Sequence, residues 1–262
     1  MKHSLIATSI VLASTLGSFA GSSGSTSTIT TTTTTTTTSS DCWAFELNPY
    51  IWAASLDAQT NLPWNGPGGP SSVQRLDTKI TGAFMLEALA RYNSVGLLVD
   101  VNWLQLDTAT RRSGILYSGA NLQTDYLYST AALTYSLPLE GAFHADLLAG
   151  ARLWHIAADY TLKPGVLAGL HGSNSQTWVS PLAGARLSYD LTKQWQLFAQ
   201  GTAGGFSGNN SQWDVIGGVG YLFNDWCMAT IGYRYLSENY QHNDFTFDAN
   251  AHGVEVGLSF KF

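Results

Sequence analysis

The chain has 262 residues, of which 11% are charged and 12% are aromatic, and its formal net charge is −6. A typical soluble domain is about 25% charged, so this chain carries far less charge than a water-exposed surface usually has. The acidic balance argues against a nucleic-acid-binding protein, which needs a basic surface to release counterions. Beyond the N-terminal segment no apolar run reaches the ~18 residues of a membrane-spanning helix. A transmembrane β-barrel or an unusually uncharged soluble β protein therefore remains.

Residues 1–20 have the pattern of a secretory signal peptide. Lys2 and His3 form a short n-region, an apolar stretch follows, and Ser18-Phe19-Ala20 places small residues where a signal peptidase cleaves. Residues 21–42 consist almost entirely of Ser, Thr and Gly. Such a tract has no apolar surface to bury, so we expect a disordered linker. The sequence thus predicts an exported chain whose folded domain is 43–262.

From Trp43 onward apolar and polar residues alternate with the period of a β-strand. In the last segment Val254, Val256 and Leu258 share one face, while Glu255 and Gly257 lie on the other. We expect ten such strands, an even number as single-chain bacterial barrels have. Their expected ranges are 43–57, 76–92, 94–107, 121–137, 142–158, 176–190, 194–206, 211–223, 226–238 and 249–262.

The connections between these segments alternate in length. Long ones are expected at 58–75, 108–120, 159–175 and 239–248, with a medium one at 207–210, and short turns lie between them. Short periplasmic turns and long extracellular loops are typical of outer-membrane barrels. We therefore predict an all-β, ten-stranded antiparallel transmembrane up-and-down β-barrel. It would be a monomer or a weak oligomer in the cell outer membrane, surrounded by lipid, with periplasmic termini.

Aromatic residues gather near the expected strand ends, as in the two girdles of a membrane protein. A soluble lipocalin-like barrel would instead need a wet outer face, which so few charges could hardly supply. Near the short turns lie Tyr92, Tyr135, Phe143, Tyr189, Trp195, Tyr221, Phe223, Trp226 and Phe262, and nearer the other rim lie Trp103, Trp178, Trp213, Tyr233 and Tyr235.

Several segments resemble a family of small, largely uncharacterised outer-membrane β-barrel proteins from Gram-negative bacteria. The resemblance covers roughly 43–262. It implies that the terminal aromatic Phe262 is part of the signal read by the barrel-assembly machinery, and it implies no agreed activity, because a fold does not name a function. The motifs are Trp43 to Ala53, Gly184-Ala185-Arg186, Tyr189-Asp190-Leu191, Gly217 to Tyr221, Gly232-Tyr233-Arg234-Tyr235 and Phe260-Lys261-Phe262.

If the polar face of each strand lines the lumen, acids and bases meet inside the barrel. Buried ions need partners, and a wide channel needs more strands than ten, so a plugged structural interior is expected. A narrow passage for small solutes is the alternative, and we expect Arg152, Arg186 and Arg234 to form the central network with Glu87, Asp146 and Glu255. The inward charged residues would be Glu46, Glu87, Arg91, Asp100, Asp146, Arg152, Arg186, Asp190, Asp214, Arg234, Glu255 and Lys261.

The sequence offers little sign of catalysis. Omptin surface proteases also have ten strands, but the local His–Asp pairs, His155 with Asp159 and His242 with Asp244, match no omptin motif. The six histidines lack metal-ligand spacing. We therefore expect no enzyme, no metal and no cofactor. An alternative role is surface adhesion through the long loops.

Cys42 and Cys227 are both expected at the periplasmic end. One strand would lie between the strands that carry them. Residues at the same level on two such strands are about 10 Å apart, beyond the ~7 Å limit for a disulfide. Cys42 precedes its strand and could bend back, so a bridge stays open.

Overall fold

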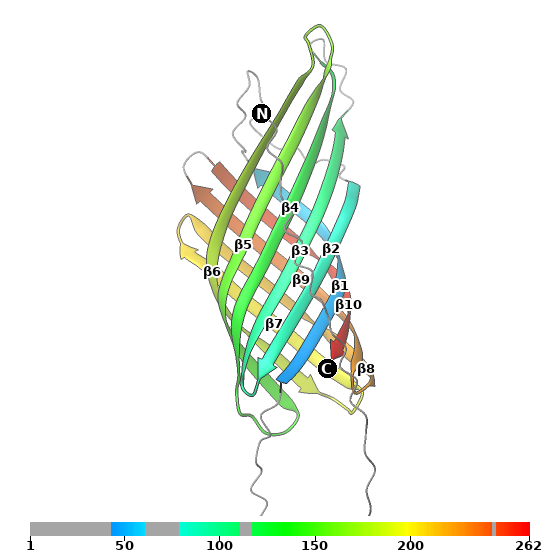
Figure 1. Ribbon diagram of the computed structural model, residues 1–262, viewed down its shortest axis with the longest axis vertical. Coiled ribbons are helices and arrows are strands. Elements are labelled where there is room, and N and C mark those ends of the chain that lie inside the picture. Colours follow the sequence, from blue (N-terminus) through cyan, green and yellow to red (C-terminus); the bar gives the residue numbers. More distant parts are fainter. Residues whose placement is uncertain (1–42, 61–78, 111–116, 243–244) are drawn as a thin grey trace, which may run out of the picture. The chain divides into compact units, whose positions relative to one another are not determined.

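The computed structural model describes residues 43–60, 79–110, 117–242 and 245–262. They form a closed antiparallel barrel in which each strand pairs with its neighbours in sequence and β1 pairs with β10 (Figure 1). The predicted ten-stranded up-and-down fold is confirmed. The strands are β1 (Trp43–Thr60), β2 (Lys79–Tyr92), β3 (Val95–Thr110), β4 (Tyr117–Ser136), β5 (Phe143–Pro164), β6 (Leu170–Asp190), β7 (Trp195–Ser207), β8 (Asn210–Asn224), β9 (Cys227–His242) and β10 (Phe245–Lys261).

The barrel closes where β1 meets β10. Glu46 pairs with Lys261 at one end of this seam and Thr60 with Phe247 at the other. The amide of Phe262 donates to the carbonyl of Phe45 at 2.9 Å. We call the end where β1 begins and β10 ends the terminal end, and the opposite end the distal end.

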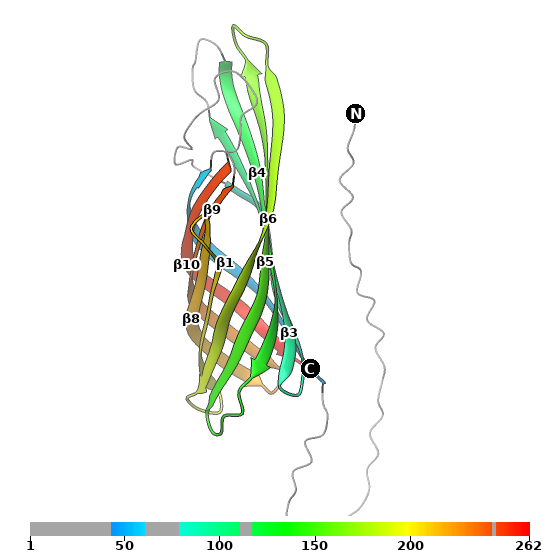
Figure 2. The ribbon, with the colours of Figure 1, turned by 90° about the vertical axis from the view of Figure 1, so that its left-hand side faces the viewer.

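Several strands are longer than the sequence pattern predicted. The expected long loops at 159–175 and 239–248 are mostly strand, because β5 runs to Pro164 before β6 begins at Leu170, and β9 runs to His242. The prediction of long loops there was wrong. Figures 1 and 2 show β4, β5 and β6 rising beyond the other strands at the distal end.

Outward-facing residues change character along the barrel. Toward the terminal end they are apolar and exposed, such as Leu133 at 63% and Ile231 and Val256 at 52%. Toward the distal end the same outward positions are polar, as at Asp125 in β4 and Ser175 in β6. The outer surface is therefore an apolar band followed by a polar zone.

Inward-facing residues change in the opposite sense. The terminal half of the lumen holds charged side chains, whereas its distal half holds a cluster of buried rings and aliphatic groups that includes Trp154, Trp178 and Phe247. Trp178 is only 5% exposed, so the prediction that it belongs to an outer girdle was wrong. Trp213 and Tyr233 do face outward at 45% and 53% exposure.

Some sequence predictions lie outside the described residues. These are the signal peptide 1–20, the linker 21–42 with Cys42, most of the expected loops 58–75 and 108–120, and Asp244. Cys227 is half-buried at the start of β9, and a bridge to Cys42 stays a prediction. Among the described residues, no helix has the length and apolar character that crossing a membrane requires.

Candidate functional site

A cluster of buried ions fills the lumen near its middle. We call it the upper ion cluster; its residues are Asp100, Arg152, Asp214, Arg234 and Glu255. The first four of these residues are at most 6% exposed.

Arg234 of β9 is the centre of the upper ion cluster. Its guanidinium donates to both oxygens of Asp214, at 2.9 Å from Nε and 2.7 Å from Nη2. It also reaches Asp100 on β3 at 3.4 Å, Glu255 at 3.2 Å and the Tyr50 hydroxyl at 3.0 Å. Since β3 and β9 lie on nearly opposite walls, these contacts cross the lumen.

Arg152 of β5 completes the cluster. Its Nη2 donates to Asp214 Oδ2 at 2.8 Å and its Nε donates to Thr130 Oγ1, also at 2.8 Å. Asp214 thus accepts from two arginines, which is how a buried carboxylate stays ionised without water.

A second set of ions, the lower ion cluster, lies nearer the terminal end. Arg186 of β6 pairs with Glu87 of β2 across the lumen, and Arg91 Nη2 lies 2.6 Å from Asp146 Oδ2. Asn48 donates to Glu87 at 3.1 Å and to Glu46 at 3.0 Å. Arg186, Glu87, Asn48 and Glu46 are therefore linked to one another, while Arg91 and Asp146 form a separate pair beside them.

Little space separates the two clusters. Leu89, Leu98 and Leu148 form a small buried group in the lumen. A cavity of about 10 Å³ is lined by Leu98, Arg152 and neighbouring residues, which is close to the room needed by a single water.

The structure divides the expected central network into these two clusters. Arg152 and Arg234 share Asp214, whereas Arg186 binds Glu87 and Asp146 binds Arg91. The remaining two expected lumen charges lie at the terminal rim. There Asp190 contacts His144 at 3.2 Å and Lys261 is exposed.

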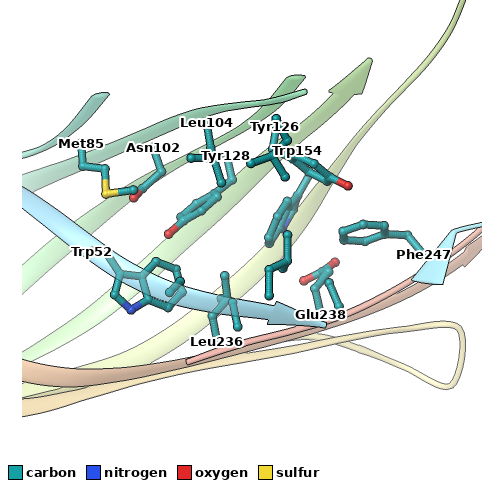
Figure 3. Close-up of a pocket in the computed structure, with 15 residues that line it drawn as sticks. Trp52, Met85, Asn102, Leu104, Tyr126, Tyr128, Trp154, Leu236, Glu238 and Phe247 are labelled. Carbon is teal, nitrogen blue, oxygen red and sulfur yellow. The ribbon is translucent and has the colours of Figure 1, made fainter. Parts of the chain in front are cut away.

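Above the upper ion cluster, toward the distal end, the lumen opens into a pocket of about 310 Å³. We call it the aromatic pocket, and Figure 3 shows its rings and aliphatic side chains around a central space. Ligand pockets of ~300–1,000 Å³ with mostly apolar walls are typical of small-molecule sites. Its lining residues are Trp52, Ala54, Leu56, Met85, Asn102, Leu104, Leu106, Tyr126, Tyr128, Trp154, Leu236, Glu238, Phe247, Ala249 and Ala251.

The rings at the floor of the aromatic pocket pack on the arginines of the upper ion cluster. The guanidinium of Arg234 lies 5.2 Å from the Trp52 ring and that of Arg152 lies 5.3 Å from the Tyr128 ring. One face of each ring is therefore covered by a cation, while both residues line the pocket.

A single carboxylate lines this apolar wall. Glu238 is 0% exposed; its Oε1 accepts from Trp178 Nε1 at 3.0 Å, and its Oε2 has no hydrogen-bond partner among the described residues. The Tyr128 hydroxyl and Trp52 Nε1 are likewise buried without a partner there. Three polar atoms of pocket residues are thus unsatisfied in an otherwise apolar site.

Sequence reasoning missed this pocket because it placed the polar face of every strand inside. A signal was present, because adjacent apolar residues mark the position where the apolar face changes side. Leu153-Trp154, Trp178-Val179 and Tyr235-Leu236 each place one side chain outward and the other inward.

The histidine pairs do not meet in the lumen. His155 faces outward and its Nδ1 lies 2.7 Å from Thr177 Oγ1, while His144 and Asp190 pair at the terminal end. No group of three potential metal-ligating side chains occurs within the described part of the chain.

No family model and no curated protein matches this sequence. Among solved structures, the barrel is similar to the outer membrane protease OmpT from Escherichia coli, with 11% identity, a TM-score of 0.53 and coverage of 84% of this chain and 97% of that one. The attachment invasion locus protein Ail of Yersinia pestis matches at 13% identity and a TM-score of 0.32, covering 85% of this chain and 100% of that one. At this identity the OmpT match shows a shared barrel fold alone.

Proposed function

We propose that the protein is an integral outer-membrane β-barrel whose lumen is closed, so that its role is structural or receptor-like rather than that of an open pore. The terminal end would face the periplasm and the distal end the cell exterior. We also propose that the chain belongs to the family of small Gram-negative outer-membrane barrels that its sequence motifs resemble.

The outer apolar band supports a membrane location. It extends from Leu127 to Tyr135 in β4 and from Trp213 to Phe223 in β8. A tilted strand crosses a bilayer in about 9–11 residues, and these stretches have that length. Aromatic residues such as Trp226 and Tyr233 lie near its two borders, as interface residues do.

The observation that carries the closed-lumen proposal is the upper ion cluster. Arg234 holds side chains from β1, β3, β8 and β10 in one layer. Breaking such buried pairs is costly, so an ion or solute could not pass without a large rearrangement. Of the two interiors expected for a ten-stranded barrel, a narrow passage and a filled lumen, the upper ion cluster favours the filled lumen.

Planar-bilayer recording of the refolded full-length mature chain tests this proposal. We expect no discrete conductance steps from the wild-type barrel. The double variant Arg152→Ser, Arg234→Ser removes both cationic groups from the cluster. It is compared with the wild type as a barrel whose lumen has been widened at this level. Recordings must use protein whose mobility in gels shifts on heating, as folded barrels do.

Discrete, salt-dependent steps from the folded wild type would overturn the closed-lumen proposal and favour a narrow pore. In that case a bulky substitution at Arg186, in the lower ion cluster, should reduce the conductance.

The polar distal zone favours a surface interaction as a second function. Exposed Ser173, Ser175 and Asp159 lie on the outer face of β5 and β6, beyond the apolar band, where a partner at the cell surface could reach them. Adhesion of cells that produce the wild type, compared with cells that produce a barrel with the 159–175 hairpin shortened, tests this role.

We propose that the barrel is not a protease, although OmpT shares the fold. Water activation needs a correctly placed base. His155 contacts Thr177 on the outer wall, and His144, which does pair with Asp190 at 3.2 Å, lies at the terminal end, on the proposed periplasmic side and away from surface substrates. Incubating the refolded barrel with a mixed peptide library should yield no cleavage products. Cleavage that a His155→Ala substitution abolishes would overturn this proposal.

A further inference from the structure

We infer that the aromatic pocket is a binding site for a small aromatic amine, whose ring packs against the apolar walls and whose ammonium group is held by Glu238. This inference goes beyond the proposed function, which names no ligand, and it can be tested without a membrane.

The walls of the pocket suit an aromatic ring. The Trp154 ring lies 4.9 Å from that of Tyr128 and 5.9 Å from that of Phe247. Offset and tilted arrangements at such distances are those in which aromatic groups attract one another. A planar ligand can extend this arrangement into the free space, whose volume of about 310 Å³ suits a small molecule.

Glu238 supplies the chemical selectivity. A buried carboxylate that lacks a partner on one oxygen is costly, and Glu238 Oε2 is such an oxygen in a pocket with mainly apolar walls. Figure 3 shows its carboxylate pointing into the pocket. A ligand N–H group would satisfy it with a charge-assisted hydrogen bond.

The charges below the pocket favour a cation over a neutral donor. The upper ion cluster sets two arginines, Arg152 and Arg234, against the three carboxylates of Asp100, Asp214 and Glu255. Glu238 adds a fourth carboxylate above them. Aromatic faces also attract ammonium groups, so the pocket combines two features that recognise a protonated amine.

Isothermal titration calorimetry of the detergent-refolded mature barrel provides the test. The probes are 2-phenylethylammonium and its neutral analogue 2-phenylethanol. We expect the ammonium probe to bind more tightly, and Glu238→Gln to weaken its binding at least about tenfold while changing the binding of the alcohol by less than about threefold.

Two further variants keep the test decisive. Ala249 lies directly opposite Glu238 across the β9–β10 pair, so Ala249→Phe should fill the pocket and abolish binding of both probes without removing the carboxylate. Asp248→Asn, on the outer face next to it, is the matched control and should bind both probes like the wild type.

Three results would overturn the inference. The first is that neither probe gives saturable heat at millimolar concentration. The second is that the barrel binds the two probes with equal affinity. The third is that the Ala249→Phe barrel still binds both probes. Each variant is first shown to fold by its heat-dependent gel mobility, so loss of binding cannot be mistaken for loss of structure. Conductance is recorded separately, so failure of the closed-lumen proposal leaves this test unaffected.

Discussion

At the residue scale the most consequential side chain is Arg234. It is 5% exposed and is shared by three carboxylates and the Tyr50 hydroxyl. The ion pairs of Asp100 and Glu255 in the described lumen are with Arg234, whereas Asp214 is also paired with Arg152.

We predict that Arg234→Met destabilises the barrel by about 3–5 kcal/mol, because it leaves buried carboxylates without their main partner. Arg91→Met, in the lower ion cluster, should cost about 1 kcal/mol or less, since Arg91 has one carboxylate partner and a side chain that is 29% exposed. Urea unfolding in lipid vesicles measures both. Equal losses would show that the shared arrangement adds nothing.

The sequence supports only part of this residue-scale description. An inward position for Arg152, Asp214 and Arg234 follows from alternation, because each lies between outward apolar neighbours. Which acid pairs with which base does not follow, since partners such as Arg186 and Glu87 come from strands that meet only across the lumen. Local periodicity carries no information about such distant pairs.

At the scale of the strand, several long elements, β9 among them, are two amphipathic segments of opposite sense. In β9, Ile231 and Tyr235 face outward in the apolar band, whereas Leu236 and Glu238 face the lumen and Ser237 faces outward beyond the band. The number of strands could be predicted because alternation persists throughout. The distal half of the lumen could not, because the rule that polar side chains line it reverses within several strands, such as β5, β9 and β10.

This change of sense gives a prediction for β9. Ile231→Arg places a charge near the middle of the apolar band and should cost about 2–4 kcal/mol in lipid. Ser237→Arg, on the same face of the same strand but beyond the band, should change stability by less than about 0.5 kcal/mol. The two unfolding curves in vesicles, measured against the wild type, decide the comparison. Similar losses at both sites would place the membrane border elsewhere.

The two ends of β6 allow a test of the proposed orientation of the barrel in the membrane. In a background where Cys42 and Cys227 are replaced by Ser, Ser175→Cys should react with a membrane-impermeant maleimide on intact cells, because its exposed side chain lies in the polar zone. Thr192→Cys, in the turn between β6 and β7, should react only after the outer membrane is permeabilised. The reverse pattern would mean that the terminal end faces outward.

At the scale of the whole molecule, the barrel has a single seam that joins distant parts of the chain. Ser259 donates to Glu46, 213 residues earlier, at 3.2 Å, whereas every other strand pair joins sequence neighbours. Loop-closure entropy opposes such contacts until the strands between them are in place. The seam is therefore expected to form last.

That order has a consequence for biogenesis. Before β1 finds β10, both strands have unpaired amides and carbonyls along one edge, and such edges readily recruit strands from other chains. On the proposed route to the outer membrane, the unfinished barrel is therefore at risk of aggregation until the seam closes. Holding chaperones, and a catalyst that keeps the two edge strands apart from competitors until they meet, would matter more to the yield of this protein than the stability of its finished core.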